Sequence, residues 1–212
     1  MTSRRTAIAA SLVLVVFGTG CSQEQPQVPS AGSGAAPDSP GAAIVVGQTP
    51  AAVNGAASIV ILESASGQTF SPPDEKAVMD QSAEMFVPPV LFVQAGQTVE
   101  FRNSDEKLHN VNVRESMSKE QLFNVAIPMG GTVDRQLPQE GLFDVHCDIH
   151  PAMAAIIVSS PTPYAKTAEP DGTVEFDDVV PGRYNAVVYA GTAKLEQSVD
   201  VVGPRTLFTV KN

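Results

Sequence analysis

Cys147, His150 and Met153 lie within seven residues of one another and could bind one metal ion together. A thiol, an imidazole and a thioether are soft or borderline ligands of the kind that select copper. Two imidazoles, one thiolate and a weak axial thioether form the blue-copper type of site. Three of these four groups are present here, so the second imidazole must come from His109 or His146, the only other histidines.

Strand alternation separates these two histidines. In residues 142–147, Phe143, Val145 and Cys147 share one strand face, which is apolar, whereas Leu142, Asp144 and His146 share the other. Cys147 shares the apolar face and is expected to point inward, whereas His146 points away from it. Adjacent side chains of an extended segment also rarely bind one ion together. We therefore predict that His146 is a surface residue and that His109 is the second imidazole.

The sequence around these residues resembles the cupredoxins, which are type 1 blue copper proteins of the amicyanin and plastocyanin kind. The resemblance covers residues 74–159 and rests on Gly96-x-x-Val99-x-Phe101-x-Asn103, on His109-Asn110-Val111, and on Gly141-x-Phe143-x-Val145-x-Cys147-x-x-His150-x-x-Met153. It implies that copper is bound by the imidazoles of His109 and His150, the thiolate of Cys147 and, axially, Met153. It also implies that Asn110 ties the two ligand loops together near the thiolate.

Each of these residues alone would be unremarkable, because a single His or Met is more often a surface or packing residue than a ligand. In this order and spacing, the set predicts one type 1 copper ion. Zinc accepts one Cys and two His, but it seldom takes a thioether in its fourth position. We expect Asp148, beside the thiolate, either to lower the reduction potential through its charge or to be well solvated.

From residue 43 onward the chain is typical of an all-β protein, with short β-branched runs between Gly, Pro, Asn and Asp residues. The only short turn of helix is expected at 116–123. So many short strands favour two β-sandwiches over one. The predicted strands are 43–47, 58–63, 77–85, 90–93, 98–102, 110–114, 131–137, 141–147, 154–159, 173–176, 183–190, 195–201 and 206–211.

The C-terminal part of the chain resembles a carboxypeptidase regulatory-like, or transthyretin-like, domain. The residues that match are Asp171-Gly172, Phe176 and Pro181-Gly182-x-Tyr184, and the Asp-Gly and Pro-Gly pairs predict two hairpin turns. Four C-terminal strands are too few for a sandwich of this family. The earlier segment 53–62 is similar to the family's early strand and is expected to complete it.

We therefore predict that residues 43–65 pair with residues 160–212 in a small transthyretin-like β-sandwich. A Greek-key cupredoxin sandwich, residues 66–159, is then inserted between the two parts, since insertions at loop tips are well tolerated. In the alternative layout, residues 43–63 form an extra cupredoxin strand, and a small C-terminal module follows. The second domain contains no His and no Cys, which gives it a structural or partner-binding role by default.

The N-terminus resembles the signal sequence of a bacterial lipoprotein. Arg4 and Arg5 precede the apolar run 7–17, which is too short for a typical membrane span, and residues 18–21 resemble a lipobox. The resemblance implies removal of residues 1–20 and lipidation of Cys21. A Leu is usual at position 18, so ordinary secretion is the alternative. Residues 21–42 are rich in Pro, Ser, Gly, Gln and Ala, which predicts a flexible tether.

Charge and cysteine content narrow the function classes. Removing residues 1–20 takes two of the 13 basic residues and no acidic one, so 11 basic residues face 23 acidic ones and the net charge changes from −10 to −12. An acidic chain without Lys or Arg clusters is a poor nucleic-acid binder. If Cys21 is lipidated, Cys147 is the only remaining thiol and no intramolecular disulfide can form.

These features predict a one-electron carrier in the bacterial cell envelope, outside the cytoplasm. The family implies that His150 lies near the surface and passes the electron to a redox partner, such as a c-type cytochrome or a dehydrogenase. Pro151, Ala152 and Met129 are expected to form a small docking patch beside it. Copper capture or delivery without electron transfer is the alternative. We expect no enzyme, because copper oxidases need further copper sites that three histidines cannot build.

Overall fold

The computed structural model describes residues 42–52 and 55–211, and every helix or strand in these ranges is a β-strand. The all-β prediction is therefore confirmed. The predicted signal peptide, Cys21 and the tether up to residue 41 lie outside the described residues. Among the residues that are described, no helix is long and apolar enough to cross a membrane.

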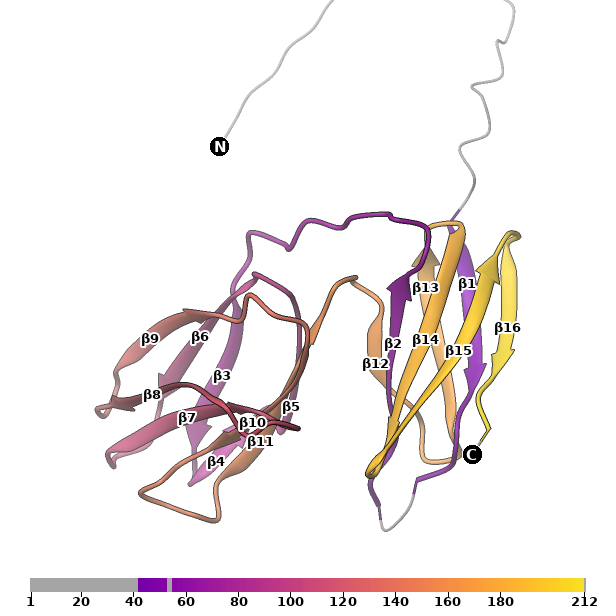
Figure 1. Ribbon diagram of the computed structural model, residues 1–212. Helices are drawn as coiled ribbons and strands as arrows, with labels where there is room; N and C mark the ends of the chain where they lie inside the picture. The colour runs from indigo at the N-terminus through magenta and orange to yellow at the C-terminus, as the bar shows by residue number, and fades with distance from the viewer. Residues whose placement is uncertain (1–41, 53–54, 212) are drawn as a thin grey trace, which may run out of the picture. The chain divides into compact units, whose positions relative to one another are not determined.

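Nine consecutive strands form the sandwich that carries the predicted ligands (Figure 1). They are β3 (Ala77–Ser82), β4 (Met85–Val87), β5 (Val90–Gln94), β6 (Thr98–Asn103), β7 (His109–Glu115), β8 (Gln121–Ile127), β9 (Thr132–Gln136), β10 (Gly141–His146) and β11 (Ala154–Ser160). One sheet has the strand order β5-β11-β10-β7-β8 and the other β4-β3-β6-β9. The two sheets share a core that includes the fully buried side chains of Phe101, Phe143 and Ile157.

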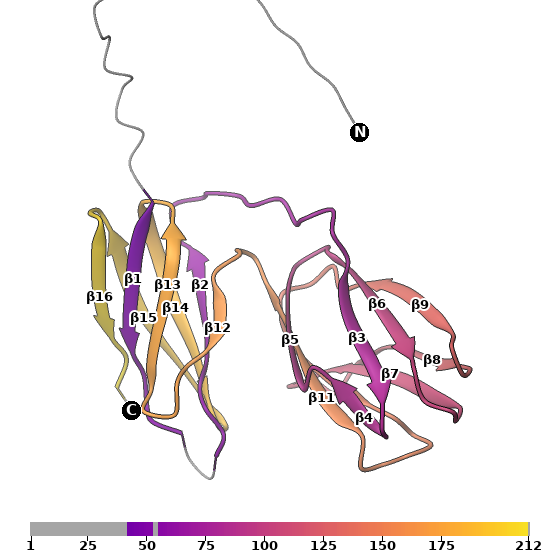
Figure 2. The same ribbon diagram turned by 180° about the vertical axis from the view of Figure 1, so that it is seen from behind.

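Strands from the two ends of the described chain form a second sandwich. They are β1 (Ala43–Gln48), β2 (Ile59–Ser64), β12 (Ala165–Thr167), β13 (Thr173–Val179), β14 (Gly182–Ala190), β15 (Ala193–Val201) and β16 (Arg205–Thr209). The sheet orders are β13-β1-β16 and β12-β2-β14-β15, so β1 and β2 pair only with strands that follow β11. Figures 1 and 2 show the indigo β1 and β2 among these orange and yellow strands. Their common core includes Phe176, Tyr184 and Phe208.

The continuous apolar run of β2 is explained by burial on both faces. Val60 and Leu62 point into the core of the second sandwich. Ile59 and Ile61 point the other way, into a third apolar cluster that also contains Val158 of β11. A strand that is covered on both sides needs no polar face, which is why this run does not alternate.

Two turns that were predicted to form hairpins connect strands of different sheets. The turn at Asp171-Gly172 lies between β12 and β13, and Pro181-Gly182 lies between β13 and β14, and neither pair of strands shares a sheet. Gly172 has φ +90°, and a Cβ atom there would lie 2.1 Å from the Thr49 carbonyl oxygen. The chain does turn at both places, but the predicted hairpins are wrong, because local sequence does not specify which strands pair with each other.

The predicted turn of helix at 116–123 is wrong. Residues 116–118 form the turn that joins β7 to β8, and β8 begins at Gln121. The Glu115 carboxylate accepts the backbone N–H groups of Met117 and Ser118, at 3.0 Å for Met117. This side chain satisfies the donors of the turn locally and replaces the hydrogen bonds that a helix would make.

The predicted single strand 77–85 is also wrong, because the chain reverses between β3 and β4. Ala83 and Glu84 both have positive φ, at 53° and 56°, as the tightest hairpin turns require. Asp105 accepts both backbone N–H groups, at 2.6 Å from Ala83 and 2.8 Å from Glu84. A carboxylate from a distant loop therefore stabilises a turn that its own residues do not predict.

Candidate metal centre

Cys147, His109 and His150 bring three metal-binding atoms together at one end of the β3–β11 sandwich. The Nδ1 atoms of both histidines lie 3.8 Å from the Cys147 Sγ atom, and all three ligand atoms lie within 4.8 Å of one another. Metal bonds of about 2.0 Å to nitrogen and about 2.3 Å to sulfur place two ligands of a trigonal site about 3.8 Å apart. The two sulfur-to-nitrogen distances therefore match those expected around one small, soft ion.

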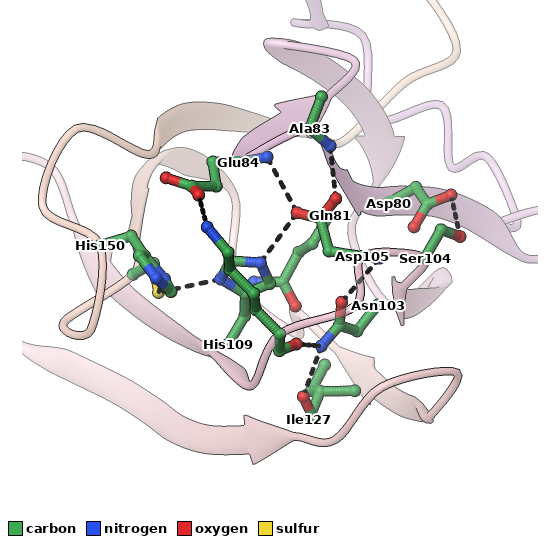
Figure 3. A network of polar contacts seen from close by, with 12 residues as sticks. Asp80, Gln81, Ala83, Glu84, Asn103, Ser104, Asp105, His109, Ile127 and His150 are labelled. Carbon is green, nitrogen blue, oxygen red and sulfur yellow. Dashed lines mark hydrogen bonds and ion pairs between the residues drawn. The ribbon is translucent and has the colours of Figure 1, made fainter.

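His109 begins β7, and its side chain is completely buried. Its Nε2 atom lies 2.9 Å from Asp105 Oδ2 (Figure 3). Its Nδ1 atom faces the Cys147 sulfur. A carboxylate partner keeps the proton on Nε2 and leaves the Nδ1 lone pair free for a metal. The backbone N–H of Glu84, followed by the His109 ring, holds the pKa of Asp105 below its usual range. The carboxylate thus remains ionised and able to orient the ring.

Cys147 directly follows β10 and is 1 % exposed, within the apolar core of the sandwich. His146 is exposed and lies outside the ligand cluster. The inward thiol and the outward imidazole are arranged as strand alternation predicted. His146 sits opposite Asn112 of β7 in the sheet register, on the outer face.

Residues 147–153 form a tight loop that carries His150. The Cys147 N–H donates to the Met153 carbonyl at 3.3 Å, and the Met153 N–H donates to the His150 carbonyl at 2.9 Å. The His150 ring is half-buried and meets the His109 ring edge to face, with 4.5 Å between centroids. Met153 is buried in the same core cluster as Cys147, and its role as axial ligand stays a prediction.

Asn110 ties the ligand loop to β7. Its Oδ1 atom accepts the Cys147 thiol at 3.3 Å, the Asp148 N–H at 2.8 Å and the Ile149 N–H at 3.4 Å. Its Nδ2 atom donates to the Asp148 carboxylate at 3.0 Å. One amide side chain therefore contacts the thiol and the two residues after it, which is the bridging position that the resemblance implied.

Asp148 is exposed, yet its carboxylate accepts hydrogen bonds from three asparagine amides. The shortest distances are 3.0 Å from Asn110, 3.0 Å from Asn112 and 2.7 Å from Asn124. The amides of Asn112 and Asn124, in that order, hold the pKa of Asp148 below its usual range. Sequence reasoning missed Asn112 and Asn124, although the spacing Asn110-x-Asn112 on a strand places both amides on one face.

Asn103 shapes the loop before His109 and was also missed as a supporting residue. It is 1 % exposed, and its Nδ2 atom donates to the carbonyls of Lys107 at 2.7 Å and Ile127 at 2.8 Å. Its Oδ1 atom accepts the Asp105 N–H at 3.0 Å. The carboxylate that orients His109 is therefore held in place from the backbone side as well.

Comparison with known proteins finds a family model that matches the part of the chain that carries the ligands. Residues 74–159 match the model of copper-binding proteins of the plastocyanin/azurin family. The chain is similar to a purple cupredoxin from Nitrosopumilus maritimus, with 22% identity over 40% of this chain and 99% of that chain and a TM-score of 0.36. It is also similar to amicyanin from Paracoccus versutus, with 19% identity over 43% and 95% of the two chains and a TM-score of 0.37. No curated protein matches it.

The family match and the residues that converge at the site point to the same metal. A buried thiol with two imidazoles is a donor set that copper favours, and the matched family binds copper. Copper is therefore the cofactor of this site.

Proposed function

We propose that this protein is a one-electron carrier that holds a single type 1 copper ion on His109, Cys147, His150 and Met153. The observation that carries this proposal is the close approach of one Sγ and two Nδ1 atoms, all within 4.8 Å, inside a β-sandwich. Bound copper supplies a one-electron redox couple. The surrounding residues determine how little the site must rearrange when the charge on the metal changes.

The ligands are fixed by the fold rather than by the metal. His109 starts a strand and is oriented by Asp105, and Cys147 directly follows a strand and is contacted by Asn110. The loop that carries His150 is closed by one backbone hydrogen bond from Cys147 to Met153 and another from Met153 to His150. Because these contacts do not involve a metal, we infer that they hold the ligands in nearly the same place in both oxidation states.

An exposed apolar surface at the same end of the sandwich would suit a redox partner. It consists of Met85, Leu108, Met129 and Ile149, which are between 46% and 64% exposed, with exposed Pro151 and Ala152. The segments that carry these residues are joined near the ligands by hydrogen bonds to Asp105, Asn103 and Asn110. Small apolar contacts suit brief redox encounters. The acidic chain would attract a basic c-type cytochrome or dehydrogenase, at a rate that falls with salt.

The copper spectrum tests this function. The protein loaded with Cu(II) should show an intense blue or green thiolate band and an EPR signal, and both should disappear and return on reduction and reoxidation. Cys147→Ser and His109→Ala should abolish the band, whereas the matched control His146→Ala should keep it. A colourless protein that holds only Cu(I) would instead indicate copper capture or delivery and would contradict the carrier function.

We further propose that the protein works in the bacterial cell envelope, anchored to a membrane through lipidated Cys21. The support is the lipobox-like sequence before Cys21 and the Pro- and Ser-rich segment after it. Labelling with a radioactive fatty acid should mark the protein and not its Cys21→Ser variant. Soluble, unlabelled wild-type protein outside the cytoplasm would instead support ordinary secretion.

The sandwich of β1, β2 and β12–β16 is proposed to be the transthyretin-like domain, interrupted by the copper-binding one. The pairing of β1 and β2 with strands after β11 supports this assignment. We propose a supporting role for it, as a platform between the tether and the copper site. Deleting residues 74–159 and joining the ends with a short linker should leave a folded β-protein, and an unfolded product would count against two domains.

A further inference from the structure

We propose that Asp148 is a positioning residue of the copper site, which fixes the ligand loop before metal binds and keeps a negative charge beside Cys147. The first part concerns the metal-free protein. The second part rests on the proposed redox function. The proposal stands on the three asparagine amides that converge on this one carboxylate.

The amides come from two neighbouring strands. Asn110 and Asn112 are alternate residues of β7, and both are nearly completely buried. Val111 points to the opposite face, into the apolar core. Asn124 of β8 lies directly opposite Asn112 in the register. The outer face of these two strands therefore presents a fixed set of N–H donors at the place where the ligand loop crosses it.

The Asp148 carboxylate at 3.0 Å and the Asn124 amide oxygen at 2.8 Å, both acceptors of the Asn110 Nδ2 atom, together determine which way the Asn110 side chain faces. An ionised carboxylate only accepts hydrogen bonds, so it requires the Nδ2 atom of Asn110 to face it. The Oδ1 atom is then directed at the Cys147 thiol and at the N–H groups of Asp148 and Ile149. If the amide turned over, it would place donors against these three donors. Asp148 thus secures the contact that holds the loop, although it is not a metal ligand.

The same arrangement places a charge near the metal. The Asp148 carboxylate and the Cys147 sulfur contact opposite ends of one amide group. A negative charge at that separation favours Cu(II) over Cu(I), and solvent weakens the effect because the carboxylate is exposed. Arg114 offsets part of it, since its guanidinium donates to Asn112 at 3.4 Å. We therefore expect a moderate lowering of the reduction potential.

Hydrogen exchange of the copper-free protein tests the positioning part. In Asp148→Asn, the backbone amides of residues 148 and 149 should exchange about tenfold faster, because the Oδ1 atom that protects them is no longer held. The matched control is Asp144→Asn, on the preceding strand β10, whose carboxylate contacts Ser116 at 2.9 Å and Lys119 at 2.8 Å. Equal exchange in the wild type and both variants would overturn the positioning role.

The reduction potential tests the charge part. Asp148→Asn should raise the affinity for Cu(I) relative to Cu(II) by about tenfold, which corresponds to about 59 mV for one electron. Asn124→Ala removes one amide but keeps the carboxylate, so it should speed exchange in the loop and leave the potential nearly unchanged. It is an exposed residue, so the variant is expected to fold. A potential that moves equally in Asp144→Asn, or not at all in Asp148→Asn, would contradict the charge effect.

Failure of this proposal can be distinguished from failure of the proposed function. A wild-type protein that binds copper but shows no reversible colour change would refute the carrier function. The exchange measurements on copper-free protein and the ratio of Cu(I) to Cu(II) affinities would still decide the role of Asp148. Conversely, a reversible wild-type band with unchanged Asp148→Asn exchange and affinity ratio would refute the role of Asp148 alone.

Discussion

Buried polar side chains differ between the two sandwiches in what they bond to. In the sandwich of β1, β2 and β12–β16, buried hydroxyls donate to nearby carbonyls: Thr49 to Gly172 at 2.9 Å and Ser58 to Pro50 at 3.1 Å. In the β3–β11 sandwich, buried amides and an imidazole gather around the ligand loop. The buried hydroxyls of the first sandwich stabilise turns and strand ends. The buried amides and the imidazole of the β3–β11 sandwich instead surround three metal-binding atoms that lie within 4.8 Å of one another.

This difference helps to tell a functional polar cluster from a structural one. A buried hydroxyl with a carbonyl partner is satisfied and needs no further explanation. The Nε2 atom of His109 has the Asp105 carboxylate as its hydrogen-bond partner. The Nδ1 atom lies 3.8 Å from the Cys147 sulfur and is free to bind a metal. Networks of this kind are maintained at a cost in stability, because each partner must be held in place. Variants should therefore affect copper binding in one sandwich and only stability in the other.

Among these variants, Asn103→Ala should have the largest effect on stability and copper binding. It leaves the buried Ile127 carbonyl and the partly buried Lys107 carbonyl without their donor, so we expect a loss of about 3 kcal/mol in the free energy of unfolding and weaker copper binding. Thr162→Val is the control, because Thr162 donates to the Leu62 carbonyl in the other sandwich. It should cost about 1 kcal/mol and leave the copper spectrum unchanged. Denaturant titration and visible spectra measure both quantities.

Asp105→Asn should weaken copper binding by about 10- to 100-fold, the usual effect of losing a carboxylate behind a metal-binding imidazole. A competition titration with a copper chelator measures this affinity. Asp134→Asn is the matched control, since Asp134 pairs with Lys76 at 2.7 Å on the surface of the same sandwich. Equal affinities in the two variants would show that the contact between Asp105 and His109 does not support the metal.

Tyr184→Phe should lower the free energy of unfolding by about 1 kcal/mol at neutral pH, because its buried hydroxyl donates to the Val180 carbonyl at 2.7 Å. Burial raises the pKa of Tyr184 to about 12, so the neutral form is favoured in the folded state. The wild type should therefore lose the stabilisation that comes from the neutral Tyr184 hydroxyl as the pH rises from about 10 towards 12. Tyr184→Phe should lack that loss, and its copper spectrum should match the wild type.

Glu115→Gln should have the smallest effect, because Glu115 caps the turn at the end of β7 away from the ligands. The backbone N–H groups of Ser118 and Met117 hold the pKa of Glu115 below its usual range. The stabilisation is present above about pH 4.3 and is lost as the pH falls through the lowered pKa. We expect a loss of about 0.5 kcal/mol at neutral pH that vanishes in acid, and no change in copper affinity. A pH series of unfolding curves measures it.

The inward thiol and the all-β class were predictable because they depend on local sequence. Alternation over 142–147 is enough to place Cys147 inside and His146 outside. The reversal at Ala83 and Glu84 was not predictable, because the carboxylate that satisfies it is 22 and 21 residues away. The support of Asp148 by Asn112 and Asn124 was missed for a similar reason. It depends on the register of β7 with β8, which local sequence does not specify.

The pairing of β2 with β12 has a consequence for the order of folding. Ile61 of β2 lies opposite Ala165 of β12, so the whole copper-binding sandwich separates two strands of one sheet. During synthesis, β3–β11 are complete before β13 exists, and β1 and β2 must wait for their partners. Once the intervening strands have folded, the chain between β2 and β12 is effectively shorter, and closing it costs less entropy. We expect the copper-binding sandwich to fold first and to act as the template on which the other one closes.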